Sequence, residues 1–197
     1  MEIYYLKKDE FLKSVSRESL EIFSDGREYQ SEDKYLEHLC GIFLTKFIAK
    51  HIYDIKNLEI EYINGKPFFK SCEVCFSISH SNNIVLAAFN NRNIGVDVEF
   101  MLPRDYQKIL NRYNVEHKNP TKIEFYRFWT LHEAEIKLNG NVRSLYSTML
   151  ERDYLITCVS DDVLVANTYI KQLICNDFVK SLEQEFKYPK NILLKNI

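Results

Sequence analysis

Two acidic residues, Asp97 and Glu99, lie two positions apart in the run I-G-V-D-V-E, whose other members are apolar or glycine. Because side chains alternate between the faces of a strand, both carboxylates share one face and the apolar residues share the other. Such close like charges repel, so one pKa should rise unless a cation lies between them. Carboxylate oxygens are also ligands that Mg²⁺ accepts. The run predicts a cation site or, as the plainer alternative, a solvated strand face.

A second group of chemically capable residues recurs at helical spacing between Phe128 and Lys137. Glu133 and Lys137 are four residues apart on one helix face, and Trp129 lies one turn earlier on it. The plain alternative is a surface ion pair worth about 0.2–0.5 kcal/mol. A zinc-protease motif is excluded, because Ile136 stands where that motif needs a second histidine.

Hydroxyl and basic side chains occur at two further places. Ser77 and Ser79 share a strand face, and His80 follows them, so these groups could hydrogen-bond a phosphate at the strand end. A serine nucleophile with His80 as its base is the rival interpretation, although no G-x-S-x-G elbow is present. Lys66 is held in a G-K-P turn, which alone indicates only the turn.

The elements that must position these residues are segregated along the chain. Apolar spacing predicts helices at 8–23, 33–53, 104–113, 121–139 and in the tail, 162–186. Alternation predicts strands at 2–6, 58–62, 74–79, 84–89, 94–100, 144–150 and 154–159. The strands between 74 and 100 are expected to form an antiparallel meander. This segregation is typical of an α+β fold, with a boundary near 100–103.

Composition limits the classes of protein to consider. The chain has 197 residues, of which 46% are apolar and 27% are charged, as in a globular protein. The net charge of -2 gives no general attraction to nucleic acid. We see no apolar run of membrane-spanning length, no signal peptide, and an odd count of five cysteines. We therefore expect a cytoplasmic protein with neither nucleic-acid nor membrane partners.

The order of the four motifs is more specific than any one of them. G-K-P, F-S-I-S-H-S, I-G-V-D-V-E and W-T-x-x-E-A-x-x-K follow one another over about residues 60–140. Together they resemble the 4′-phosphopantetheinyl transferases. The resemblance implies transfer of the 4′-phosphopantetheine arm of coenzyme A to a serine of an acyl or peptidyl carrier protein, releasing adenosine 3′,5′-bisphosphate. The alternatives are an inactive module of this fold that binds coenzyme A or carrier protein, and a structural interaction domain.

The resemblance also implies roles for individual residues. Mg²⁺ would be bound by Asp97, Glu99 and Glu133, and Glu133 would act as the base for the carrier serine. Lys137 and His80 would stabilise charge on the phosphates during transfer. The residues expected to contact coenzyme A are Lys66, Ser79, His80, His132 and Lys137. His132 stands where the family usually has lysine.

The amount of sequence before I-G-V-D-V-E resembles the long type of this family. That type implies two similar α+β subdomains fused in one chain, expected here at 1–101 and 102–197, with coenzyme A between them and a monomer as the working state. The second half looks abbreviated after Gly140. A basic residue near the 3′-phosphate of the nucleotide is also implied, and Lys34 and Arg27 are both candidates.

Overall fold

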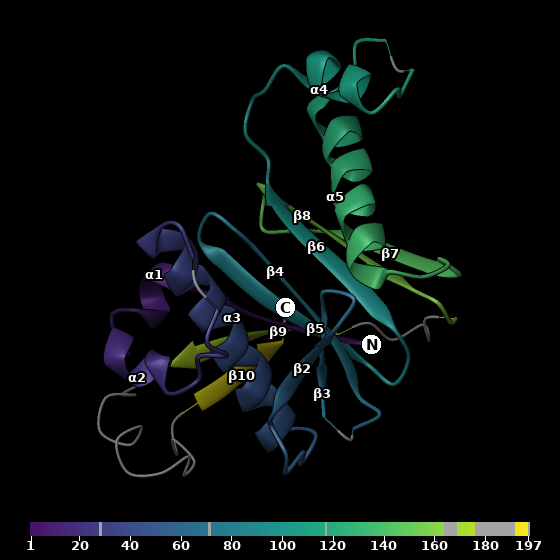
Figure 1. Ribbon diagram of the computed structural model, residues 1–197. Helices are drawn as coiled ribbons and strands as arrows, with labels where there is room; N and C mark the ends of the chain where they lie inside the picture. The colour runs from purple at the N-terminus through teal and green to yellow at the C-terminus, as the bar shows by residue number, and fades with distance from the viewer. Residues whose placement is uncertain (28, 71, 117, 164–168, 176–191, 197) are drawn as a thin grey trace.

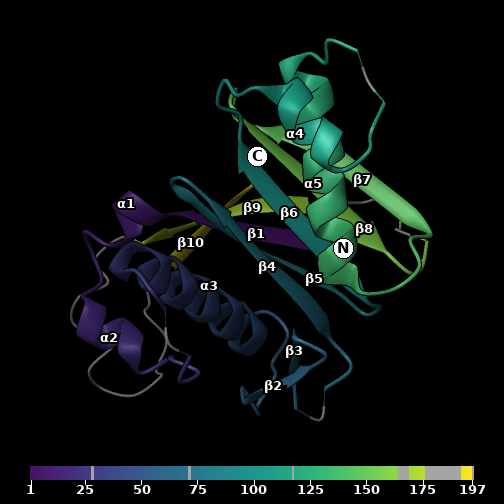
Figure 2. The same cartoon turned by 45° about the horizontal axis from the view of Figure 1, so that its top comes forward.

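Two long helices each cover a β-sheet in the computed structural model, which describes residues 1–27, 29–70, 72–116, 118–163, 169–175 and 192–196 (Figure 1, Figure 2). The strands are β1 (Glu2–Lys7), β2 (Ile60–Ile63), β3 (Lys66–Phe69), β4 (Cys75–Ser81), β5 (Ile84–Asn90), β6 (Ile94–Phe100), β7 (Ser144–Leu150), β8 (Tyr154–Ser160), β9 (Tyr169–Cys175) and β10 (Ile192–Asn196). The helices are α1 (Lys8–Phe11), α2 (Arg17–Glu21), α3 (Glu32–His51), α4 (Tyr106–Arg112) and α5 (Lys122–Leu138). The expected α+β class is confirmed.

The strands of the described residues form sheets of five, three and two strands. Their orders are β10-β9-β1-β5-β4, β6-β8-β7 and β2-β3. In the five-stranded sheet, β1 lies between β5, to which it is antiparallel, and β9, to which it is parallel. Strands from both ends of the chain therefore share one sheet.

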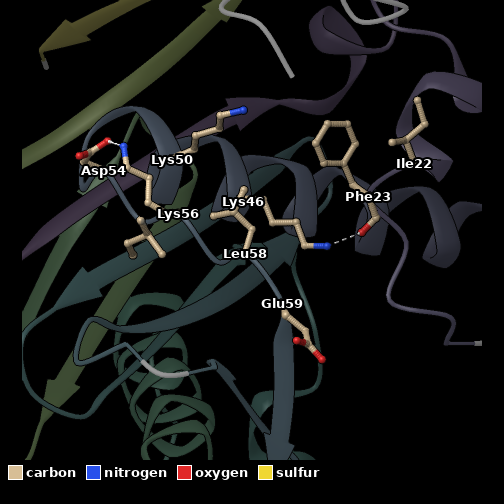
Figure 3. Close-up of a pocket in the computed structure, with 9 residues that line it drawn as sticks. Ile22, Phe23, Lys46, Lys50, Asp54, Lys56, Leu58 and Glu59 are labelled. Carbon is tan, nitrogen blue, oxygen red and sulfur yellow. Dashed lines mark hydrogen bonds and ion pairs between the residues drawn. The ribbon is translucent and has the colours of Figure 1, made fainter. Parts of the chain in front are cut away.

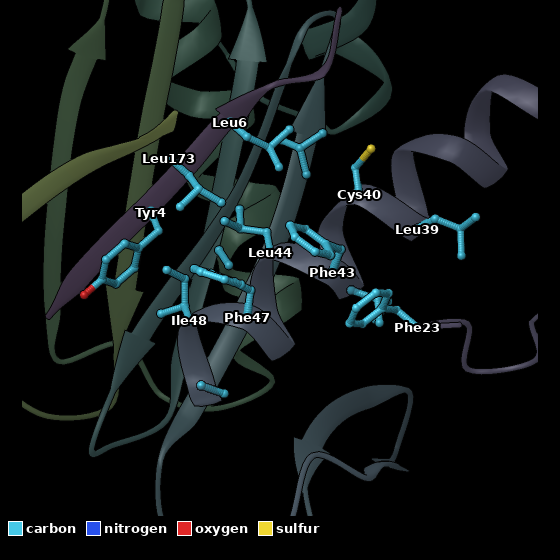
Figure 4. Packing of buried hydrophobic residues seen from close by; sticks show 14 of the residues in the cluster. Tyr4, Leu6, Phe23, Leu39, Cys40, Phe43, Leu44, Phe47, Ile48 and Leu173 are labelled. Carbon is cyan, nitrogen blue, oxygen red and sulfur yellow. The ribbon is translucent and has the colours of Figure 1, made fainter. Parts of the chain in front are cut away.

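The first layer is built by α3 on the five-stranded sheet (Figure 4). Ser31 caps the start of α3 by accepting a hydrogen bond from the backbone N–H of Lys34. The apolar side of the helix then packs against β1, β5 and β9. The cluster includes Leu39, Phe43, Leu44, Phe47 and Ile48 of α3 together with Tyr4, Leu6, Phe89 and Leu173.

The second layer is built by α5 on β6 and β8. A capping box between Thr121 and Glu124 starts α5, and Asn139 ends it in the left-handed conformation, with φ of 51°. Gly95 allows the helix to approach β6, because a Cβ there would lie 2.0 Å from the backbone oxygen of Ala134. The opposite face of β6 packs on β1 and β5, so this strand lies between two layers.

Three sequence-based predictions about elements are wrong: the single helix at 8–23, the meander that runs to residue 100, and the helical tail. The helix expected at 8–23 is two short helices, because Ser16 ends the intervening turn and caps α2. The apolar residues of this stretch are buried all the same, so their spacing could not reveal the break. The expected meander stops after β5, since β6 pairs with β8. β3 in the G-K-P region had not been anticipated as a strand.

The third error concerns the tail. Residues 169–175, expected to be helical, form β9, because the backbone of β1 offers them a pairing edge far away in the sequence. Residues 164–168 and 176–186 of that expectation lie outside the described residues. The other expected helices and strands are present, with ends shifted by a few residues. Among the helices that the structure describes, none is long and apolar enough to span a bilayer.

Candidate functional site

Asp97 lies at the centre of the candidate site, on the face of β6 that looks toward α5. Its side chain is only 6% exposed, so the solvated-face alternative is wrong for this residue. Oδ1 accepts hydrogen bonds from Ser79 Oγ at 2.8 Å and Lys137 Nζ at 2.7 Å. Oδ2 is buried and has no hydrogen-bond partner among the residues that the structure describes. A buried carboxylate oxygen without a partner is costly, and a bound cation would relieve that cost.

Glu99 lies two residues further along the same face. Oε2 accepts a hydrogen bond from Ser81 at 3.0 Å, and Oε1 accepts one from the indole of Trp129 at 3.1 Å. Burial, and secondly the charge of Asp97, raise the pKa of Glu99 above its usual range. The direction agrees with the rise expected for one member of this pair, but burial comes before repulsion among its causes. The bonds from Ser81 and Trp129 had not been expected, although both residues lie in the motifs.

A line of three serine hydroxyls joins β4 to β6. Ser77, Ser79 and Ser81 accept hydrogen bonds from the backbone N–H groups of Val96, Val98 and Phe100 at 3.1, 3.2 and 3.0 Å. We call this line the serine seam. Because the other edge of β6 pairs with β8, the seam connects the five-stranded sheet to the three-stranded sheet through side chains.

The carboxylate of Glu133 differs from that of Asp97 in its surroundings. Lys137 of α5 forms its ion pair with Asp97 of β6. The alternative of a surface ion pair between Glu133 and Lys137 is therefore wrong. Glu133 is half-buried, and its carboxylate has no hydrogen bond or ion pair in the described part of the chain. No group of three or more His, Cys, Asp or Glu arranged for a metal occurs among the described residues. The structure thus brings Asp97 and Glu99 onto one strand face. Glu133 lies one turn from both Trp129 and Lys137 on α5, so it shares the helix face that contacts these two carboxylates.

Lys66 turns inward from the β2–β3 hairpin and is 7% exposed. Nζ donates to the side chain of Asn93, to the carbonyl of Ile94 at 2.6 Å and to the carbonyl of Leu138 at 3.2 Å. Burial lowers the pKa of Lys66 to about 8. The amine therefore joins the start of β6 to the C-terminal end of α5, where a cation is favourable. These contacts favour a structural role for Lys66.

The two histidines named from sequence lie in different surroundings. His80 is exposed over 40% of its side chain, and Nδ1 lies 3.1 Å from Oε2 of Glu37 on α3. Partial burial lowers the pKa of His80, while the charge of Glu37 opposes this. His132 contacts the rings of Tyr113, Phe128 and Trp129, with centroids 5.0–6.4 Å apart. Its ring is thus part of an aromatic cluster.

The two candidates for the 3′-phosphate site also differ. The guanidinium of Arg27 lies 3.6 Å from the ring centroid of Tyr62, and Nε lies 3.9 Å from a carboxylate oxygen of Asp25. Lys34 is exposed in the first turn of α3.

A small hollow of about 250 Å³ lies between the β2–β3 hairpin, β4 and α5. Lys66, Pro67, Ile136 and Lys137 are among its lining residues, so two of the expected residues meet there. A larger pocket of about 470 Å³ lies elsewhere, beside α3 (Figure 3). Its lining includes three lysines, of which Lys46 donates a hydrogen bond to the carbonyl of Phe23. None of the expected site residues lines the larger pocket.

Comparison with known proteins gives several relatives of one kind, although no family model matches the chain. The chain is 28% identical to 4′-phosphopantetheinyl transferase ffp of Bacillus subtilis over 166 residues, which are 74% of this chain and 70% of that protein. It is 26% identical to 4′-phosphopantetheinyl transferase Sfp of Bacillus subtilis strain 168, over 75% of this chain and 71% of the relative. It is 30% identical to 4′-phosphopantetheinyl transferase gsp of Aneurinibacillus migulanus, over 66% and 58%. The resemblance expected from the four motifs is confirmed, and so is its likeness to the Sfp type.

Proposed function

We propose that this relative of the 4′-phosphopantetheinyl transferases transfers the 4′-phosphopantetheine arm of coenzyme A to a serine of an acyl or peptidyl carrier protein. It is thus a holo-carrier-protein synthase. The observation that carries the proposal is the meeting of Asp97, Glu99 and Lys137, from β6 and α5, in a chain similar to several proteins of that name. Coenzyme A is the co-substrate.

The reaction breaks the pyrophosphate of coenzyme A. The carrier serine oxygen forms a bond to the phosphorus that bears the pantetheine arm, and the bond from that phosphorus to the bridging oxygen breaks. The electron pair leaves with adenosine 3′,5′-bisphosphate, and the serine proton goes to a base. Phosphoryl transfer of this kind depends mostly on positioning and on stabilising charge.

The residues of this chain fit the parts of that reaction. Glu133 has a carboxylate with no partner among the described residues, so it is able to accept the serine proton. Lys137 and the exposed ring of His80 supply positive charge or hydrogen-bond donors for phosphate oxygens. The resemblance also places His132 and Lys66 in the proposed coenzyme A site. The contacts of His132 with aromatic rings and the hydrogen bonds of Lys66 to backbone carbonyls support structural roles instead.

The residues present fit Mg²⁺ in part. Asp97 offers a buried carboxylate oxygen that no described residue hydrogen-bonds, and Glu99 lies next to it on the same strand face. Mg²⁺ in proteins is usually held by one or two carboxylates together with substrate phosphates, so a set of three protein carboxylates is not needed. Asp97 and Glu99 would hold the ion, with Glu133 as a further candidate. The bound ion would neutralise charge on the pyrophosphate.

Several finer expectations stay predictions. They are the fusion of two similar α+β subdomains at 1–101 and 102–197, the monomeric state, and a cytoplasmic location. The last is supported by the free thiols of Cys40, Cys72, Cys75 and Cys158, which suit a reducing compartment.

The test is intact-mass analysis of candidate carrier proteins after incubation with this protein, coenzyme A and Mg²⁺. We expect a mass gain of one 4′-phosphopantetheine arm on a serine. Glu133→Gln should abolish the gain, whereas the matched variant Glu135→Gln, in an exposed residue of the same helix, should keep it. Coenzyme A binding without any mass gain would support the inactive module instead. Failure of both binding and transfer would support a structural domain.

A further inference from the structure

The hydroxyl of Ser79 has no hydrogen-bonding capacity left for a ligand. A serine hydroxyl has one donor and two acceptor sites. Ser79 donates to Asp97 Oδ1 at 2.8 Å and accepts from the N–H of Val98 at 3.2 Å and from Lys137 Nζ at 2.9 Å. It could therefore donate to a phosphate only by giving up Asp97.

Ser81 repeats this arrangement one step along the strand. It donates to Glu99 Oε2 at 3.0 Å and accepts from the N–H of Phe100 at 3.0 Å. Each of these two serines thus connects a carboxylate to the backbone N–H of the residue that follows it. Since the N–H groups belong to β6 itself, Ser79 and Ser81 each hold one carboxylate in register with the strand that carries it.

Ser77 belongs to the same seam but contacts no carboxylate among the described residues. It accepts from the N–H of Val96 at 3.1 Å, as the other two serines do from their own partners. Ser77 and Ser79 are both 4% exposed. Ser77 is therefore a matched control for Ser79 and Ser81. All three are serines of β4 that accept a backbone hydrogen bond from β6, but in the described part of the chain only Ser79 and Ser81 also donate to a carboxylate.

We propose that Ser79 and Ser81 are positioning residues, which orient Asp97 and Glu99 for a bound cation, and that Ser79 does not itself donate to a coenzyme A phosphate. This inference rests on the proposed function for the identity of the cation and ligand, but not for the orientation of the carboxylates. Groups that hold metal-ligating side chains in place commonly change metal affinity about 10–100-fold when they are lost.

The first measurement uses the protein without coenzyme A or carrier. Trp129 is the only tryptophan of the chain and donates to Glu99, so its emission reports on that carboxylate. Ser81→Ala should shift the Trp129 emission and Ser77→Ala should leave it unchanged. Ser81→Thr keeps a hydroxyl and should restore the wild-type spectrum. Equal spectra of Ser81→Ala and wild type would overturn the role of Ser81.

The second measurement is Mg²⁺ saturation with coenzyme A present, followed by Trp129 emission and by transfer. Ser79→Ala and Ser81→Ala should raise the half-saturating Mg²⁺ concentration about 10-fold or more, and Ser77→Ala no more than about twofold. Equal effects of all three variants would show a seam that is only structural. A Ser79→Ala protein with weaker coenzyme A binding and unchanged Mg²⁺ saturation would show that Ser79 contacts the ligand.

The two proposals can fail separately. If the wild-type protein modifies no carrier, the proposed function fails, while the emission of Ser81→Ala against Ser77→Ala still decides the positioning role. If Ser79→Ala does not fold, the Ser81→Ala and Ser81→Thr pair carries the test.

Discussion

The ion pair between Lys137 and Asp97 changes what removal of the Asp97 charge should do. Repulsion between Asp97 and Glu99 alone would predict unchanged or higher stability. Lys137, however, is 30% exposed in its side chain and loses its counter-ion, while Asn at position 97 can still accept from Ser79. We expect Asp97→Asn to fold, to lose about 1–3 kcal/mol of unfolding free energy and to lose transfer. Urea unfolding and the carrier mass assay measure both, and intact transfer would contradict the assignment.

Because of Lys66, the unfolding free energy of the protein should rise with pH in the alkaline range. Burial lowers its pKa in the folded state to about 8, against 10.5 for a lysine in the unfolded chain. Between these values the unfolded chain holds a proton that the folded chain has released, so unfolding free energy rises with pH. The rise is up to about 3 kcal/mol and is complete above pH 10.5.

The Lys66→Met variant isolates this effect from other titrating groups. Between about pH 8 and pH 10.5, the unfolding free energy of the wild type should rise relative to that of Lys66→Met. Urea titrations at several pH values measure it. A difference that stays constant would mean that the amine keeps its ordinary pKa in the folded protein.

His132 offers a choice between packing and phosphate binding. Its ring contacts three aromatic rings, each worth about 0.5–1.5 kcal/mol beyond the area buried. His132→Ala should therefore lower the unfolding free energy by about 1 kcal/mol or more, and His132→Phe should restore most of it. Coenzyme A affinity is the second readout. A stable His132→Phe protein with weakened coenzyme A binding would support the phosphate contact implied by the resemblance.

At the scale of elements, the contact of α5 with β6 depends on Gly95. A Cβ there would lie 2.0 Å from the oxygen of Ala134 and 2.5 Å from the nitrogen of Leu138, both backbone atoms that no rotamer change can move. We expect Gly95→Ala to cost about 3 kcal/mol or more in urea unfolding, at the upper end for overpacking. Gly140→Ala is the control, since its nearest contact is 3.4 Å from a side-chain atom. Equal losses in the two variants would contradict this account.

The sequence predicted individual helices and strands better than it predicted which of them contact one another. Alternation placed Asp97 and Glu99 correctly on one face, because side-chain direction along a strand is a local property. The partners of those carboxylates could not be read in this way, since Ser81 and Trp129 reach Glu99 from other elements. Lys66 looked like a turn residue open to a nucleotide, and only the packing of α5 shows its amine bonded inside the protein.

At the scale of the whole molecule, the two layers are connected by strands that lie on either side of the expected boundary at 101. β6 precedes the boundary and pairs with β8, whereas β9 follows it and pairs with β1. The serine seam and the apolar face of β6 add further contacts between the layers. We therefore expect the molecule to unfold in one transition, even if its halves are related by duplication.

Leu173 of β9 allows a test of that coupling. It is 3% exposed in the core beneath α3, so Leu173→Ala should cost about 2–5 kcal/mol of unfolding free energy. Tyr169→Ala, at a residue 51% exposed on the same strand, should cost less than about 1 kcal/mol. The far-UV signal reports on the whole chain, and Trp129 emission reports on the layer of α5. Both transitions should shift together in Leu173→Ala. If the Trp129 transition stays at the wild-type urea concentration while the far-UV signal splits into two steps, the layers unfold independently and β9 stabilises only the first.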